Sequence, residues 1–155
     1  MDTFWQHYTE LAAVVYPPLT PTDGVEDSIL LAAEARLGVL LPRRLRECYL
    51  LTGKRSDMHR SLDVLLPPQE LKLASETIIF YLENQGVVVW GIRIADAHLE
   101  DPPVYLAANE SRLVWELAWD HLSGFLHFML LWQAMGVGQV TMEWHQSTIV
   151  PFSGK

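Results

Sequence analysis

The stretch from Thr77 to Ile94, TIIFYLENQGVVVWGIRI, constrains the fold more than any other part of the chain. Apolar residues fill both of its halves with a period of two, and most are β-branched or aromatic, which is typical of strands. The first half is predicted to have two faces, with Ile78, Phe80 and Leu82 on one and Ile79 and Tyr81 on the other. The second half has the same period, so the halves are predicted to pair as the arms of one β-hairpin.

The two arms are separated by Glu83-Asn84-Gln85-Gly86, which has the composition of a tight turn. Gly86 can take the positive φ that closes a type I turn with a bulge. Both faces of both arms are largely apolar, so helices or further chain must cover much of each side. We therefore expect this hairpin at the centre of an antiparallel sheet.

Four segments have the three- and four-residue spacing of apolar residues that indicates helices, and proline or glycine stands at several of their ends. The predicted helices are residues 2–15, 25–37, 42–53 and 120–135. Thr22 or Asp23 is expected to cap the second helix. The fourth is apolar nearly all round, so it is expected to lie buried against a sheet or a partner. The inward face of the third helix is predicted to comprise Leu45, Cys48, Tyr49 and Thr52.

Shorter segments account for the rest of the chain. Strands are predicted at 62–66, 104–107 and 140–144, a helical turn at 69–74, a mobile polar loop at 54–60, loops at 19–24 and 96–101, and a loose tail at 146–155. Residues 113–119 fit either a packed turn or a strand. The chain has 155 residues and no internal repeat, which predicts one domain, 1–155, at ~100–200 residues per domain.

The composition is that of a globular protein with its own core. Half of the residues are hydrophobic, and a chain of this length buries roughly 70% of the surface of its unfolded form. Cys48 is the one cysteine, which excludes an intramolecular disulfide and a cysteine-based zinc cluster and fits a reducing compartment. The N-terminus lacks the pattern of a signal peptide, and the longest apolar segment, 125–135, is shorter than the ~20 residues of a membrane span. We therefore expect a soluble cytoplasmic protein.

The formal net charge of −8 bears on the choice of partner. Such a chain repels nucleic acid and anionic membranes, and the densest basic group, Arg43, Arg44 and Arg46, is too short for a groove-binding stripe. We expect no nucleic acid and no membrane among the partners. A basic protein is the natural partner for an acidic surface.

No pattern of catalytic, metal-binding or cofactor-binding residues stands out. None of the six histidines forms an i, i+4 pair, and His121 and His127 are six residues apart. Glu116 and Asp120 are interpreted as a solvated pair, Cys48 as a buried thiol, and Ser123 has no nucleophile-elbow motif. We therefore expect no enzyme, no metal and no cofactor.

Six tryptophans are many for a chain of this size. Trp90 is predicted to pack in the core. Trp115, Trp119 and Trp144 can lie in the core or on the surface, and exposed tryptophans would make good binding hot spots.

Three stretches together resemble one known family. They are Glu34-Ala35-Arg36-Leu37-Gly38 running into Leu41-Pro42 and Tyr49…Gly53; Phe80-Tyr81-Leu82-Glu83-Asn84-Gln85-Gly86 running into Trp90-Gly91-Ile92; and Asp101-Pro102-Pro103-Val104. In this order they resemble the SUKH superfamily, which includes fungal cell-wall-synthesis regulators and bacterial immunity proteins. The resemblance covers about 25–135, and it departs from the commoner pattern at Arg43-Arg44, where an acidic residue often sits.

The resemblance implies an α+β fold with N-terminal helices, a central antiparallel sheet and a C-terminal helix packed on that sheet. It also implies binding rather than catalysis, because bacterial members typically neutralise a toxin, often a nuclease, by binding it. The first hypothesis is therefore an immunity protein, a monomer or weak dimer that binds a basic toxin domain. The alternative is a regulatory scaffold domain that binds endogenous proteins. The candidate partner-binding residues are Glu83, Asn84, Gln85, Asp101, Glu110 and Trp115.

Overall fold

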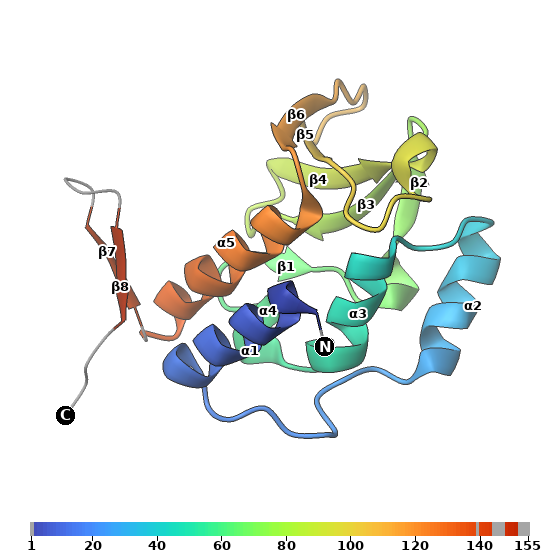
Figure 1. The fold of residues 1–155 in the computed structure, drawn as a ribbon. Coiled ribbons are helices and arrows are strands. Elements are labelled where there is room, and N and C mark those ends of the chain that lie inside the picture. Colours follow the sequence, from blue (N-terminus) through green and yellow to red (C-terminus); the bar gives the residue numbers. More distant parts are fainter. Residues whose placement is uncertain (1, 139, 144–147, 152–155) are drawn as a thin grey trace.

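The computed structural model describes residues 2–138, 140–143 and 148–151 and has the expected α+β architecture, with helices first, then an antiparallel sheet, then a helix packed on it (Figure 1). The helices are α1 Thr3–Val15, α2 Asp27–Leu37, α3 Arg43–Thr52, α4 Ser56–His59 and α5 Leu122–Gly136, with the 3-10 turns η1 Pro68–Glu70 and η2 Ile94–Asp96. The strands are β1 Val64–Leu65, β2 Lys72–Ala74, β3 Thr77–Leu82, β4 Val88–Arg93, β5 Val104–Ala108, β6 Glu116–Trp119, β7 Val140–Glu143 and β8 Thr148–Pro151.

The predicted hairpin, β3 and β4, forms the centre of the main sheet. The strand order is β1-β3-β4-β5-β6, β2 also pairs with β3, and all neighbours are antiparallel. Gly86 has φ 71°, and its N–H donates to the carbonyl of Glu83 at 2.8 Å, so the predicted turn is confirmed. β7 and β8 form a separate two-stranded sheet beyond α5.

The predicted alternation of faces along the first arm is wrong beyond Ile79. A β-bulge lies between Ile79 and Tyr81, and a bulge adds one residue to one strand and shifts its side chains relative to the partner strand. Phe80 and Tyr81 therefore both contact Phe125 of α5, with ring centroids 5.5 and 5.1 Å apart. The bulge thus directs two adjacent aromatic rings into the core.

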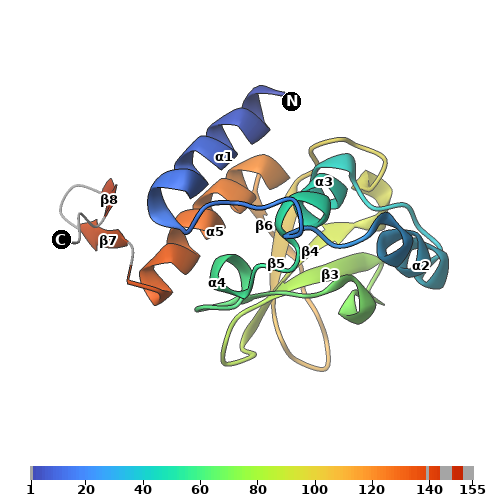
Figure 2. The same ribbon diagram turned by 90° about the horizontal axis from the view of Figure 1, so that it is seen from below.

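α5 lies across the sheet, and α1 lies beside α5 in both views (Figures 1 and 2). The hydroxyl of Tyr16, just after α1, donates to the carbonyl of Leu130 on α5 at 2.6 Å. Phe125, fully buried, contacts Trp90 of β4 at 5.8 Å between ring centroids. The prediction of a buried apolar helix against a sheet is therefore confirmed. None of the helices in the described ranges combines the length and apolar character that crossing a membrane requires.

The predicted inward face of α3 is confirmed, since its four residues are all buried. α2 begins two residues later than predicted, and neither Thr22 nor Asp23 caps it. Asp23 accepts hydrogen bonds from Thr20 and Arg55 instead. The N-cap position of α2 is taken by Glu26, which makes no side-chain capping bond.

Several of the shorter predictions need correction. Residues 54–60 are not wholly loop, because α4 forms there and buries Met58 and His59. Residues 69–74 hold η1 and then a strand, β2, rather than one helical turn. Residues 113–119 end in a strand, β6, and the predicted loose tail contains β8.

Gln133 of α5 is fully buried and joins three parts of the fold. Its amide oxygen accepts from the Ser61 hydroxyl and from the backbone N–H groups of Leu62 and Asp63, at 2.8–3.2 Å. Its amide nitrogen donates to the carbonyl of Asp63 at 2.6 Å and to the hydroxyl of Tyr81 at 2.7 Å. One side chain therefore holds the segment before β1 against both α5 and β3.

We expect Gln133→Met, which keeps the length of the side chain, to lower the free energy of unfolding by about 3 kcal/mol. The variant leaves several buried polar groups without partners, and each costs about 1–3 kcal/mol. Urea denaturation followed by fluorescence measures the change. The control is Gln6→Met on the exposed side of α1, where a change within about 0.5 kcal/mol is expected. Equal stability of the two variants would contradict the assignment.

His59 makes the stability depend on pH. It is buried, and burial lowers its pKa from 6.5 to about 4, although Thr52 contributes a 2.8 Å hydrogen bond to its Nε2. The unfolded chain therefore takes up a proton before the folded chain does. The contribution of neutral His59 to the free energy of unfolding is fully present above pH 6.5. It declines by up to about 3 kcal/mol as the pH falls towards 4. Chemical denaturation between pH 7 and 4 checks this, and His59→Gln is expected to flatten the profile relative to the wild type.

Candidate functional site: an acidic aromatic cleft

The structure divides the six predicted partner-binding residues among three places. Glu83, Asn84 and Gln85 form the tip of the β3–β4 hairpin, as predicted from the turn sequence. Glu110 lies near this tip, because the Asn109 backbone N–H donates to the Val87 carbonyl and its side chain to the Gly86 carbonyl, both at 2.8 Å. Asp101 precedes β5 at the opposite end of the sheet, and Trp115 lies over the middle of β4.

The Glu83 carboxylate stabilises its own turn. Its two oxygens accept from the backbone N–H groups of Gln85, at 3.2 Å, and Val87, at 2.9 Å. The side chains of Asn84 and Gln85 are exposed. Glu83 is half-buried, so it retains access to a partner while it holds the hairpin tip in one shape.

Asp101 has a structural role at the start of α5. Its Oδ1 accepts from the Ser123 backbone N–H at 2.8 Å, and its Oδ2 accepts from the Ser123 hydroxyl at 2.7 Å. These bonds satisfy a free donor in the first turn and place a negative charge at the positive end of the helix. Asp101 therefore acts as a capping residue supplied from outside the helix.

Trp115 and Trp119, two of the three tryptophans left open by the sequence, are half-buried. Trp115 covers Gly91, where an added Cβ would come within 3.0 Å of the indole ring, on the opposite face of the sheet from α5. Trp119 contacts Phe128 of α5 at 5.5 Å between ring centroids. Each is therefore partly in the core and partly on the surface. Trp144 lies outside the described residues.

A cleft of about 370 Å³ lies between the hairpin, the segment before β1 and α5. Its size is at the lower end of ligand pockets, which are ~300–1,000 Å³. Its polar and aromatic lining residues are Asp63, Glu83, Asn84, Trp90, Phe128 and Trp132. We name it the Asp63 cleft. It therefore contains two of the predicted partner-binding residues and joins them to four that were not predicted.

Aromatic rings form two walls of the Asp63 cleft. Phe128 and Trp132, one turn apart on α5, are stacked, with an interplanar angle of 15° and centroids 6.2 Å apart. Trp90 on β4 meets Tyr81 edge-on at 5.8 Å. All three cleft rings are half-buried, so part of each ring remains accessible. The prediction of Trp90 in the core is correct only for part of its surface.

Asp63 is the buried charge of this cleft, with only 6% of its surface exposed. Its Oδ1 accepts from the Asn84 backbone N–H at 3.1 Å, and its Oδ2 accepts from the indole N–H of Trp132 at 2.9 Å. Burial raises the pKa of the Asp63 carboxyl above its ordinary value, and the two hydrogen bonds offset only part of that rise. The negative charge of Glu83 acts in the same direction as burial.

Ion pairs are concentrated away from the Asp63 cleft. In the part of the chain that the structure describes, they use Arg43, Arg44, Arg46 and Arg55, and none of them includes Asp63 or Glu83. The sequence adds to this asymmetry. Residues 1–75 carry ten acidic and eight basic side chains, whereas 76–155 carry nine acidic and three basic.

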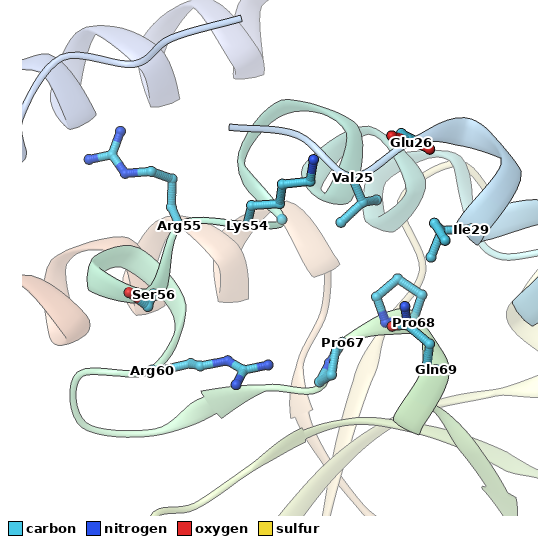
Figure 3. A pocket seen from close by; sticks show the side chains of 11 residues that line it. Val25, Glu26, Ile29, Lys54, Arg55, Ser56, Arg60, Pro67, Pro68 and Gln69 are labelled. Carbon is cyan, nitrogen blue, oxygen red and sulfur yellow. The ribbon is translucent and has the colours of Figure 1, made fainter. Parts of the chain in front are cut away.

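A second cleft, of about 470 Å³, has a different character (Figure 3). It lies between α2, the residues around α4 and the Pro67-Pro68 segment. Lys54 and Arg60 line it, and the guanidinium of Arg55 points away from it. Arg55 instead pairs with Asp23 and Asp57 at 3.0 and 2.8 Å. With exposed cations on its rim, this cleft is poorly suited to a basic partner.

Metal binding and thiol reactivity both lack a suitable arrangement of side chains in the described ranges. No group of three or more His, Cys, Asp or Glu side chains there is arranged to hold a metal ion. Cys48 is fully buried, which raises the pKa of its thiol to about 12 and keeps it protonated. Glu116 and Asp120 are both exposed, as the solvated pair was predicted to be.

The residues missed by the sequence analysis had weak signals. Asp63 lies at the edge of a predicted strand, where a single acidic residue is unremarkable. Phe128 and Trp132 are four apart on a helix predicted to be buried, and that i, i+4 spacing is a signal for one shared face. The proximity of that face to the hairpin tip depends on tertiary packing, which no local pattern contains.

Comparison of the chain with models of protein families, with curated proteins and with solved structures finds no match. The SUKH resemblance therefore stays a prediction from the three stretches of sequence that carry it.

Two of the predicted site residues are expected to differ in their effect on stability. Asp101→Ala removes the cap of α5 and is expected to cost about 1 kcal/mol. Glu110→Ala removes an exposed carboxylate with no side-chain hydrogen bond among the described residues and is expected to change stability by less than about 0.5 kcal/mol. Thermal denaturation of both variants measures the difference, and equal effects would exclude the capping role of Asp101.

Proposed function

We propose that this chain is a non-catalytic protein-binding domain, an immunity protein that binds and neutralises a basic toxin domain. The observation that carries the proposal is the Asp63 cleft, which joins two carboxylates to three accessible aromatic rings. Such a combination suits a positively charged protein surface, because aromatic residues are enriched among binding hot spots and opposite charge favours encounter. The net charge of −8 and the SUKH resemblance support the same function.

The mechanism follows from charge and shape. The acidic surface attracts the toxin and speeds its diffusional encounter. The rigid hairpin tip and the aromatic rings of α5 then form the centre of the contact, where exclusion of water strengthens each polar interaction. The bound domain covers the active site of the toxin or blocks the path of its substrate. The proposal includes a cytoplasmic location and a monomer or weak dimer as the binding form.

Co-expression with the toxin encoded by the adjacent gene tests this function. We expect growth to be rescued, the two purified proteins to form a stable complex, and the association rate to fall as salt is raised, because screening weakens attraction between exposed charges. Stopped-flow fluorescence, with tryptophan as the reporter, measures the rate.

The control is an unrelated acidic protein of similar size and net charge, which should neither rescue growth nor form a complex. Absence of both rescue and complex for this chain would overturn the proposal. Capture of several endogenous proteins, with no effect on the toxin, would favour the regulatory scaffold instead.

A further inference from the structure

The Asp63 carboxylate is buried without a cationic partner among the described residues. A buried carboxylate is costly unless a cation or several hydrogen bonds compensate for it. Asp63 accepts from two neutral donors, and no ion pair of the described residues includes it. Each oxygen therefore keeps one lone pair beyond the bond that it accepts.

The surroundings of Asp63 favour a cation over other ligands. Glu83 lines the same cleft and adds a second carboxylate, so an anion would be repelled. The faces of Trp and Phe rings attract cations through their quadrupoles, by ~0.5–2 kcal/mol. Trp132 links both features, because its ring stacks with Phe128 and its N–H donates to Asp63. Because the indole N–H already donates to Asp63, it is not free to donate to a ligand. The carboxylate can still accept further hydrogen bonds.

We propose that the Asp63 cleft receives the guanidinium of one arginine side chain from the partner, with Asp63 as the anchoring carboxylate and Trp132 and Phe128 as the aromatic wall. The assignment rests on the proposed function, which supplies the basic partner. Arginine fits better than lysine, because its planar group can stack on a ring and donate several hydrogen bonds in the same plane. The arginine would act as the central hot spot of the interface.

Two other sites among the described residues are less suited to a cation. The cleft of Figure 3 has Lys54 and Arg60 on its lining and would repel an arginine. Arg93 already covers the ring of Tyr105 at 4.0 Å on the sheet, which occupies one further aromatic face. The Asp63 cleft therefore suits an external cation better than either of these two sites.

The direct test uses small probes rather than a partner. N-acetyl-arginine amide carries the guanidinium without other charges, and N-acetyl-citrulline amide is its neutral isostere. Titration of the folded protein, followed by the NMR signal of the Trp132 indole N–H, is expected to show binding of the arginine probe. The citrulline probe is expected to bind at least about tenfold more weakly, since charge supplies most of the attraction. Equal binding of the two probes would overturn the proposal.

Variants locate the site. Asp63→Asn is expected to weaken binding of the arginine probe by about tenfold or more. Because Asp63 also holds the hairpin tip, Phe128→Leu provides a second variant that keeps the carboxylate and removes one ring, with an expected loss of about threefold. The matched controls are Lys54→Ala in the cleft of Figure 3 and Glu10→Gln on the exposed side of α1. Both controls are expected to leave binding of the arginine probe unchanged. If either control weakened this binding as much as Phe128→Leu does, the assignment of the site would be wrong.

The two proposals can fail separately. If the toxin binds Asp63→Asn and Phe128→Leu as tightly as the wild type, the arginine site is wrong and the immunity function stands. If the arginine probe binds as expected and no toxin is neutralised, the cleft stands as a guanidinium site and the immunity function is wrong.

Discussion

The side-chain amide of Gln133 is the interaction on which the arrangement of this protein depends. It occupies a fully buried position on α5 and satisfies backbone groups of Leu62 and Asp63 together with the hydroxyl of Tyr81. An apolar residue there would leave these groups without partners in a medium of low dielectric constant. The preceding residue, Trp132, donates its indole N–H to the Asp63 carboxylate. Two consecutive residues of α5 therefore stabilise the fold and the candidate site, Gln133 the former and Trp132 the latter.

The β-bulge of β3 has the complementary effect on the sheet. By directing Phe80 and Tyr81 to the same side, it supplies a dense aromatic contact with Phe125. Phe125 also contacts Trp90, so the core and the cleft share a continuous set of rings. A cluster of this kind is closely packed and tolerates few changes in volume. The cleft is consequently built on a closely packed support, which would lower the entropy lost on binding of the proposed partner.

Much of the fold could be predicted from local patterns, because the period of apolar residues reports which side of an element is buried. The hairpin and the inward face of α3 follow from this rule, and the turn at Gly86 follows from the positive φ that glycine adopts without strain. The position of Phe80 does not, since a bulge depends on how two strands pair. The role of Asp63 cannot be predicted from local sequence either, because its hydrogen-bond partners, Asn84 and Trp132, are at least twenty residues away in sequence. Glu83 was predicted to bind a partner as a polar residue of the hairpin tip, and both of its carboxylate oxygens accept hydrogen bonds within its own turn.

The unequal distribution of basic residues along the chain has a consequence at long range. The first 75 residues form helices α1 to α4 and the short strands β1 and β2, whereas the other strands of the main sheet and α5 come from the second half, where acidic residues outnumber basic ones three to one (Figure 1). Negative charge is therefore concentrated in the half of the chain that forms most of the sheet and α5. A polycation approaching from solution experiences a torque that turns the sheet and the hairpin tip towards it before any atoms touch, so that orientation precedes contact.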